Sequence, residues 1–276
     1  MGVVLELGLG CDSFERFVMK VVILCGGYGT RIRDVTDNVP KPMIPIGRFP
    51  ILWHIMKYYA SFGHRDFVLC LGYKSNVIKD FFLNYEAHTR DFTIELGRKD
   101  KLIFHAEHEE SDWKVTLVDT GLEAMTGARI KRIQKYICDE DFMLTYGDGV
   151  GNVNLDSLLE FHRRHGRALT VTGVRPPGRF GELVHADGLV TAFNEKPQVT
   201  CGRISGGFFV ATPQVFDYLN DEETLVFEQQ PMRAMVSDKQ LMVFEHDGFW
   251  QPMDTPREFQ LLNSVYDEGG APWVRW

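Results

Sequence analysis

The sequence predicts an α/β protein: a mixed, mostly parallel sheet with helices on both faces. Short β-branched apolar runs that stop at glycine are typical of buried parallel strands. These runs alternate along the chain with segments whose apolar residues recur at helical spacing. The 276 residues can bury one large core, and no internal repeat or composition break marks a second independent domain. We therefore expect a single domain over residues 19–276, preceded by an extension over residues 1–18.

Strands and helices alternate clearly in the first part of the chain. The apolar run over residues 21–25 ends at Gly26-Gly27 and predicts the first strand. Helical spacing predicts a helix over residues 53–62, for which Gly63 is a typical end. The other expected elements here are strands over 67–71, 142–146 and 168–174, and helices over 77–83 and 158–165.

The pattern is more broken towards the C-terminus, where proline-containing loops separate the elements. Apolar runs predict strands over residues 208–210 and 241–244, and helical spacing predicts helices over residues 215–219 and 256–266.

Composition narrows the class of partner and the compartment. The formal charge is −8, from 30 Lys and Arg against 38 Asp and Glu, so the chain is poorly suited to follow a nucleic-acid backbone. No apolar run is long enough to cross a bilayer, and residues 1–18 lack the basic start of a signal peptide. The five cysteines are scattered and never spaced C-x-x-C, which favours reduced, buried thiols. We expect a cytoplasmic protein with no nucleic-acid or membrane partner.

A glycine-rich segment, GGYGTR over residues 26–31, directly follows the first expected strand. Glycines there let backbone N–H groups approach phosphate oxygens. The segment lacks the Gly-Lys-Ser/Thr end of a Walker A loop, and Ile32 stands where a dinucleotide fingerprint needs its third glycine. A phosphate-binding loop and a simple tight turn both remain open from these residues alone.

Two cations flank the rest of this loop and favour phosphate chemistry. Arg31 and Lys41 stand at either side of it. A reaction between a sugar phosphate and a triphosphate must overcome repulsion between two polyanions, which fixed cations reduce. Arg31 can grip oxygens in a fork, whereas Lys41 is a movable point charge.

The loop, GGYGTRIRDVTDNVPKPMIPIG, resembles the signature of the sugar-nucleotide pyrophosphorylases. Flanking motifs narrow the resemblance to the glucose-1-phosphate cytidylyltransferase family and follow its order from Met19 to the end. They are PILWHIMKYY (50–59), LVDTG (117–121), TGARIKR (126–132), TYGDGV (145–150), PPGRFGEL (176–183), NEKP (194–197), GGFFV (206–210), GFWQPMDT (248–255) and APW (271–273).

The resemblance implies a Rossmann-like fold with a smaller sugar-binding portion, an Mg²⁺ cofactor and a homo-oligomeric state. It implies that Asp148 and Asp254 hold the metal, and two carboxylates suit a hard cation that takes its other ligands from water and phosphates. The expected catalytic residues are Arg31, Lys41 and Asp148. The expected nucleotide-binding residues are Gly26, Gly27, Gly29, Thr30, Arg31, Thr120, Gly121 and Arg129.

On the sugar-phosphate side the resemblance implies Tyr146, Glu195, Lys196, Ser205 and Gly206. The family usually has Asn where this chain has Ser205, and Ala where it has Glu182. Both positions lie in stretches that the resemblance places around the sugar, so the sugar itself stays open. Phe49 is a third departure, where the family usually has Lys.

The resulting expectation is a transfer of a cytidylyl group from CTP to a sugar 1-phosphate, with α-D-glucose 1-phosphate as the leading acceptor. Another sugar or nucleotide, or a family member that only binds nucleotides, remains an alternative. A hydride-transferring oxidoreductase is disfavoured by the missing fingerprint. We interpret His105, Glu107 and His108 as part of a solvated acidic loop, because no H-E-x-x-H motif is present.

Overall fold

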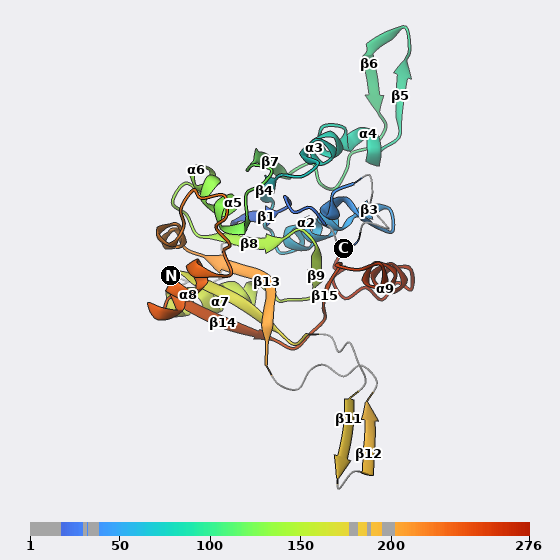
Figure 1. The fold of residues 1–276 in the computed structure, drawn as a ribbon. Helices are drawn as coiled ribbons and strands as arrows, with labels where there is room; N and C mark the ends of the chain where they lie inside the picture. Colours follow the sequence, from blue (N-terminus) through green and yellow to red (C-terminus); the bar gives the residue numbers. More distant parts are fainter. Residues whose placement is uncertain (1–17, 30–31, 33–38, 177–181, 187–188, 195–201) are drawn as a thin grey trace, which may run out of the picture.

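The computed structural model describes residues 18–29, 32, 39–176, 182–186, 189–194 and 202–276. Its centre is a seven-stranded sheet in the order β14-β10-β13-β8-β1-β4-β7 (Figure 1). The strands are β1 (Lys20–Leu24), β4 (Asp66–Leu71), β7 (Lys114–Asp119), β8 (Phe142–Tyr146), β10 (Leu169–Val174), β13 (Ile204–Ala211) and β14 (Leu241–His246).

The sheet is mixed but mostly parallel, as the sequence predicts. The neighbours of β1 and β4 pair in parallel, as do β10 and β14. Only β13 runs against its two neighbours, β8 and β10. The carboxyl ends of β1, β4, β7 and β8 therefore lie at one edge, where ligands bind in open α/β sheets.

Alternate residues of the central strands feed two separate cores. Val21 and Ile23 of β1 join one cluster of buried side chains, whereas Val22 and Leu24 join the other. Both faces of the strand are apolar because both are covered by helices. One face is covered by α2 (Ile51–Ser61), α3 (Ser75–Leu83), α7 (Leu155–His165) and α9 (Pro256–Asp267), and the other by α5 (Thr126–Arg132), α6 (Gln134–Ile137) and α8 (Gln230–Ser237).

The C-terminal tail closes the first of these cores. Trp273 is fully buried, and its indole N–H donates to the Nδ1 atom of His54 on α2 at 3.4 Å. The other ring nitrogen of His54 lies 2.9 Å from the carbonyl of Ile46. Burial lowers the pKa of His54 to about 4, so this contact is made by a neutral ring.

Smaller two-stranded sheets lie outside the central sheet. The pair of β9 (Gly149–Gly151) and β15 (Trp250–Pro252) is antiparallel and joins two distant parts of the chain. The other pairs are β2 (Pro45–Ile46) with β3 (Phe49–Pro50), β5 (Phe92–Glu95) with β6 (Arg98–Phe104), and β11 (Glu182–Ala186) with β12 (Leu189–Asn194). Figure 1 shows β5–β6 and β11–β12 extending from opposite ends of the body.

Most expected elements are confirmed, with ends displaced by a few residues. The helix expected over residues 215–219 is a 3₁₀ helix, η3 (Pro213–Tyr218). The expectation of uniformly buried thiols is wrong for Cys138, which is exposed; Cys25 and Cys70 are buried. Cys138 follows α6 in a left-handed turn, which turns it away from the core. Within the described residues, no helix is both long and apolar enough to span a membrane.

Candidate active site

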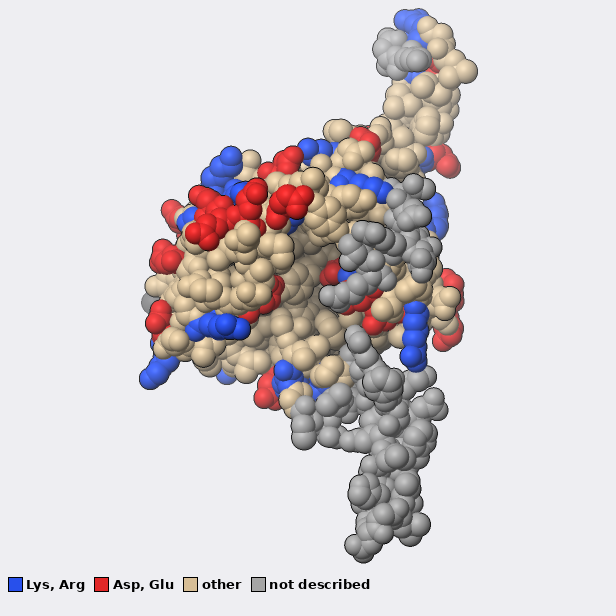
Figure 2. Space-filling model, viewed as in Figure 1, with Lys and Arg blue, Asp and Glu red and all other residues tan. Residues whose placement is uncertain are grey.

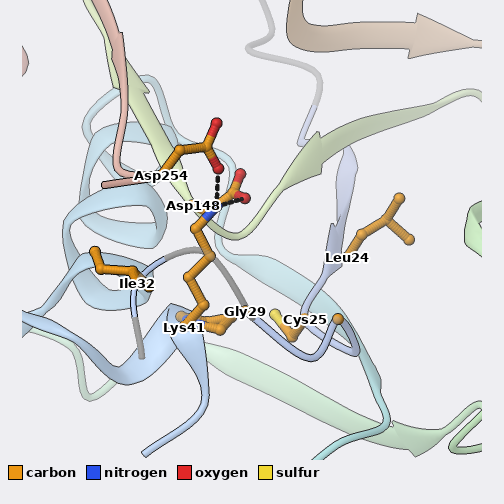
Figure 3. Close-up of a pocket in the computed structure, with 9 residues that line it drawn as sticks. Leu24, Cys25, Gly29, Ile32, Lys41, Asp148 and Asp254 are labelled. Atoms are coloured by element: carbon orange, nitrogen blue, oxygen red, sulfur yellow. Dashed lines mark hydrogen bonds and ion pairs between the residues drawn. The ribbon is translucent and has the colours of Figure 1, made fainter. Parts of the chain in front are cut away.

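A cavity of about 260 Å³ opens at the edge where the parallel strands end. Figure 2 shows that the face in view is hollowed near its centre, with mainly uncharged side chains along the walls. Figure 3 shows how the cavity-lining side chains lie. The lining residues are Leu24, Cys25, Gly27, Gly29, Ile32, Lys41, Pro42, Asp148 and Asp254.

The pairing of β9 with β15 brings Asp148 and Asp254 together. Asp148 occupies the turn between β8 and β9, and Asp254 follows β15 by two residues. Gly149 pairs with Pro252, and the N–H of Met253 donates to the carbonyl of Asp148 at 2.8 Å. Neither motif alone indicates this short ladder, so proximity of the two carboxylates is visible only in the fold.

The start of α9 fixes the backbone at Asp254. Thr255 is the N-cap and Glu258 completes a capping box. The Glu258 carboxylate also accepts the backbone N–H of Asp254 at 2.7 Å. Glu258 thus supports Asp254 from outside the cavity, and the sequence signal that could have found it is the Thr-x-x-Glu pattern.

Lys41 bridges the two carboxylates. Its Nζ atom donates to Oδ2 of Asp148 at 2.6 Å and also to Oδ1 of Asp254 (Figure 3). Burial lowers the pKa of Lys41, but Asp148 and Asp254 more than offset it, so the pKa is raised. The ammonium therefore stays charged between the carboxylates.

Local geometry holds the backbone of Lys41 in place. Lys41 begins the 3₁₀ helix η2 (Lys41–Met43), flanked by Pro40 and Pro42, which fix the chain direction. Gly29 has φ +62°, and a Cβ there would lie 3.2 Å from the Cβ of Lys41. Glycine at position 29 thus allows the loop after β1 to turn tightly against the lysine.

Arg129 lies beneath the loops that surround the cavity, and only 4% of its surface is exposed. Its guanidinium donates to five acceptors of this chain at 2.8–3.2 Å. They are the carbonyls of Gly26, Leu71, Gly121 and Leu122 and the hydroxyl of Thr120. Because these groups lie at or just after the ends of β1, β4 and β7, Arg129 ties the three strand ends together.

Thr120 and Gly121, two of the expected nucleotide-binding residues, belong to the same network. Thr120 is buried, donates its hydroxyl hydrogen to the carbonyl of Leu71 at 2.7 Å, and accepts from Arg129. Arg132 donates to the carbonyl of Thr120 at 2.7 Å. The Tyr28 hydroxyl donates to the Glu123 carboxylate, and this hydrogen bond connects the glycine loop with the loop after β7. Sequence reasoning missed Glu123, for which no motif provides a signal.

Tyr146, Ser205 and Gly206 lie together at the ends of β8 and β13. The Tyr146 hydroxyl donates to Glu228; burial first, and then that carboxylate, raise the pKa of Tyr146. The Gly206 carbonyl accepts the indole N–H of Trp250 at 2.7 Å. The Ser205 side chain is exposed, and its hydroxyl accepts from the N–H of Gly207 at 3.4 Å. Glu228 and Trp250 were not singled out from the sequence.

Four of the expected site residues lie outside the described part of the chain: Thr30, Arg31, Glu195 and Lys196. Of the other expected residues, Gly27, Gly29, Lys41, Asp148 and Asp254 line the cavity, and Gly26, Thr120, Gly121 and Arg129 form the network beneath it. Tyr146, Ser205 and Gly206 do not line this cavity. His108, set aside from metal binding, lies within 3.9 Å of Glu86 and 3.7 Å of Glu110. In the segments that the structure describes, no three His, Cys, Asp or Glu side chains gather as a metal site.

Known proteins resemble this chain along nearly its whole length. Residues 20–263 match the model of the family described as Nucleotidyl transferase. The glucose-1-phosphate cytidylyltransferase of Salmonella typhimurium is 46% identical, over 94% of this chain and 100% of that protein. The mannose-1-phosphate guanyltransferase of Gibberella zeae is 30% identical, over 90% of this chain and 64% of that protein.

Solved structures share the fold at low sequence identity. HddC from Yersinia pseudotuberculosis aligns with a TM-score of 0.65 and 22% identity, over 90% of this chain and 100% of that one. At this identity it is a likeness of fold.

Proposed function

Because this chain belongs to the nucleotidyl transferase family, we propose that it transfers the cytidylyl group of CTP to a sugar 1-phosphate, with α-D-glucose 1-phosphate as the leading acceptor. The observation that carries the proposal is the convergence of Lys41, Asp148 and Asp254 beside a glycine loop at the carboxyl edge of the sheet. The 46% identity to a glucose-1-phosphate cytidylyltransferase supports this choice of nucleotide and sugar.

The reaction is a single displacement at phosphorus. A phosphate oxygen of the sugar 1-phosphate attacks the α-phosphorus of CTP, and the bond from that phosphorus to the bridging oxygen of pyrophosphate breaks. The products are the CDP-sugar and pyrophosphate. Because the attacking phosphate is already anionic, the protein need not supply a base, and its main task is to align and neutralise charges.

The residues of this chain divide that task. Backbone N–H groups of the glycine loop can bind triphosphate oxygens, and Lys41 can neutralise charge that develops on the leaving pyrophosphate. Arg129 holds the loop from below through the carbonyl of Gly26. For the sugar phosphate we assign the five residues that the family resemblance implies: Tyr146, Glu195, Lys196, Ser205 and Gly206. Lys196 would orient the attacking phosphate.

The donor set at the cavity fits Mg²⁺. Asp148 and Asp254 offer carboxylate oxygens that already converge on the Lys41 ammonium, and their side chains are 35% and 28% exposed. When bound there, Mg²⁺ would neutralise charge on the triphosphate and at the reacting phosphorus. Two protein carboxylates leave room for the phosphate and water ligands that this ion prefers.

Product identification tests the proposal. The protein is incubated with Mg²⁺, one nucleoside triphosphate and one sugar 1-phosphate at a time, and the sugar nucleotide and pyrophosphate are quantified. We expect CDP-glucose as the main product. The Asp148→Asn variant serves as the negative control and should form no product. Release of orthophosphate without a sugar nucleotide, or nucleotide binding without turnover, would contradict the proposal.

A different acceptor sugar is the second candidate, favoured by Ser205. Asn offers a donor and an acceptor to a sugar hydroxyl, whereas Ser is shorter and has one rotatable hydroxyl. Ser205→Asn is then expected to raise kcat/KM for glucose 1-phosphate relative to other hexose or heptose 1-phosphates. Competition between paired sugar phosphates measures this ratio. An unchanged ratio would show that position 205 does not read the sugar.

We also propose a homo-oligomer located in the cytoplasm. The family resemblance supports the first, and the scattered cysteines without a C-x-x-C pair support the second. Light scattering after gel filtration and cell fractionation test these two statements independently.

A further inference from the structure

Lys41 occupies the position between the two carboxylates that the metal needs. Its Nζ atom contacts Oδ2 of Asp148 and Oδ1 of Asp254, and all three residues line the cavity. Two carboxylates that converge this closely repel each other unless a cation lies between them. An ammonium and a divalent ion cannot share that position, because like charges at contact distance repel strongly.

The backbone of Lys41 is fixed, whereas its side chain is flexible. Its backbone is held by a proline on each side, Pro40 and Pro42, and by close packing of Gly29 against its Cβ. The four-carbon side chain has rotatable bonds and three donors, so the ammonium can change partners while the backbone stays. Figure 3 shows the side chain extended from the cavity floor towards the carboxylates, with the glycine loop at its base.

From this geometry we propose that Lys41 and the divalent cation exchange at the Asp148–Asp254 pair. Without the metal, Lys41 neutralises both carboxylates and keeps them together. Metal binding displaces the ammonium, which becomes free to contact an anion in the same cavity. The exchange itself rests on the contacts of Lys41; the identity of that anion as a triphosphate rests on the proposed function.

The exchange links the binding of metal and of triphosphate. Lys41 competes with the metal in the substrate-free protein and so weakens metal binding there. A triphosphate that takes up the displaced ammonium removes this competition. By thermodynamic reciprocity, the metal must then strengthen triphosphate binding by the same factor.

The test measures metal binding without nucleotide. Lys41→Met keeps the length of the side chain and removes its charge. Mn²⁺ binding, followed by electron paramagnetic resonance of the free ion, is expected to be at least about 10-fold tighter in this variant than in the unmodified protein. In parallel, the variant should melt lower than the unmodified protein without metal, and added Mg²⁺ should raise its melting temperature more.

Lys57 provides a matched control. Its Nζ atom also bridges two carboxylates, at 2.8 Å from Glu109 and in contact with Glu110, and its side chain is 9% exposed. Neither it nor its partners line the active-site cavity. Lys57→Met should lower the melting temperature without metal but leave Mn²⁺ affinity and the metal-dependent rise unchanged. Lys41→Arg, which keeps the charge, should retain the weak metal binding of the unmodified protein.

The outcomes separate this inference from the proposed function. Equal or weaker Mn²⁺ binding by Lys41→Met would overturn the exchange, because the lysine would then help to shape the metal site. Tighter binding that Asp148→Asn abolishes would support the exchange. If the metal results hold but product analysis finds no CDP-sugar, the exchange stands and the proposed function fails.

Discussion

At the residue scale, the burial of Arg129 favours a structural role rather than the direct nucleotide contact that its motif suggests. Resemblance implies an arginine on the nucleotide side, yet its donors are directed at carbonyls and a hydroxyl of this chain. Burial lowers its pKa, which is the expected response of a cation placed beneath three loops. We infer that Arg129 positions the site through Gly26 and contributes little charge to the cavity.

Arg129→Lys is expected to lose most of this network, because a single ammonium cannot reach acceptors spread across the planar fork. Unsatisfied buried carbonyls cost about 1–3 kcal/mol each, so the free energy of unfolding should fall clearly. The KM for CTP should rise about 10-fold or more while kcat changes less. Arg132→Lys, on the same helix and less buried, is the control and should change both quantities less. A loss confined to kcat would contradict a positioning role.

The two cavity carboxylates should be required for turnover but not for folding. Asp148→Asn and Asp254→Asn each remove one negative charge from the expected metal site, while Lys41 keeps its other carboxylate partner. We expect turnover to fall by at least about 100-fold, with the melting temperature little changed. Steady-state kinetics over a range of Mg²⁺ concentrations and calorimetry measure both. Near-normal turnover at limiting Mg²⁺ would remove that residue from the metal site.

At the element scale, helices α2 and α7 each carry a buried neutral histidine. Burial lowers the pKa of His54 to about 4, and burial, then His165 and Arg163, lower that of His162 to about 4. His162 also lies 2.8 Å from the Thr170 hydroxyl, which anchors α7 to the sheet. Both elements are thus fixed by rings that resist protonation in the folded state.

Acid should weaken the fold through these two positions. In the unfolded chain each ring binds a proton near pH 6.5, whereas in the folded protein it does so only near pH 4. Below pH 6.5 the unfolded state binds more protons, so the free energy of unfolding falls as pH drops from about 6.5 to 4. Urea titrations at several pH values should show this slope. His162→Gln should make the slope shallower; an unchanged slope would exclude His162 as a source.

At the scale of the whole molecule, the sequence predicts well which segments form most strands of the central sheet, but it does not predict their order in the sheet. Strands such as β1 and β8 are continuous apolar runs because both faces are buried, and such runs stand out in a sequence. The edge strand β7 and the exposed hairpin β5–β6 were not predicted, because half-exposed strands carry mixed polar and apolar residues. The pairing of β9 with β15 was not predicted for a different reason: three-residue strands that contain glycine or proline show no detectable periodicity.

The same distinction applies to the site. The glycine loop and its cations are contiguous, so residue chemistry alone indicates phosphate binding. The carboxylate pair is assembled by tertiary pairing, and only the family resemblance links Asp148 with Asp254 before the fold is known. The bridge from Lys41 and the burial of Arg129 depend on packing, which no local pattern encodes.

Removal of residues 1–17 should leave the fold and activity largely intact. The first strand of the sheet begins at Lys20, and Met19 is already part of the core. The backbone N–H of Met19 donates to His64 at 3.2 Å, so Val18 is retained to keep that group a peptide. In a second variant, Met19→Ala in the same shortened chain removes the buried methionine side chain and should be less stable. Thermal unfolding and turnover of both variants check this; inactive protein from the deletion alone would contradict it.

The close packing of Gly26 and Gly72 against Arg129 constrains the order in which this site can evolve. A Cβ at Gly26 would come within 2.2 Å of the guanidinium, and one at Gly72 within 2.6 Å. A first mutation at either glycine therefore meets an arginine that five hydrogen bonds hold in place. A smaller residue at position 129 would relieve this clash but loosen three loops, and a Cβ at Gly72 would still lie 2.8 Å from the carbonyl oxygen of Gly26. A change at any one of these three positions therefore carries a cost before a second change can compensate for it.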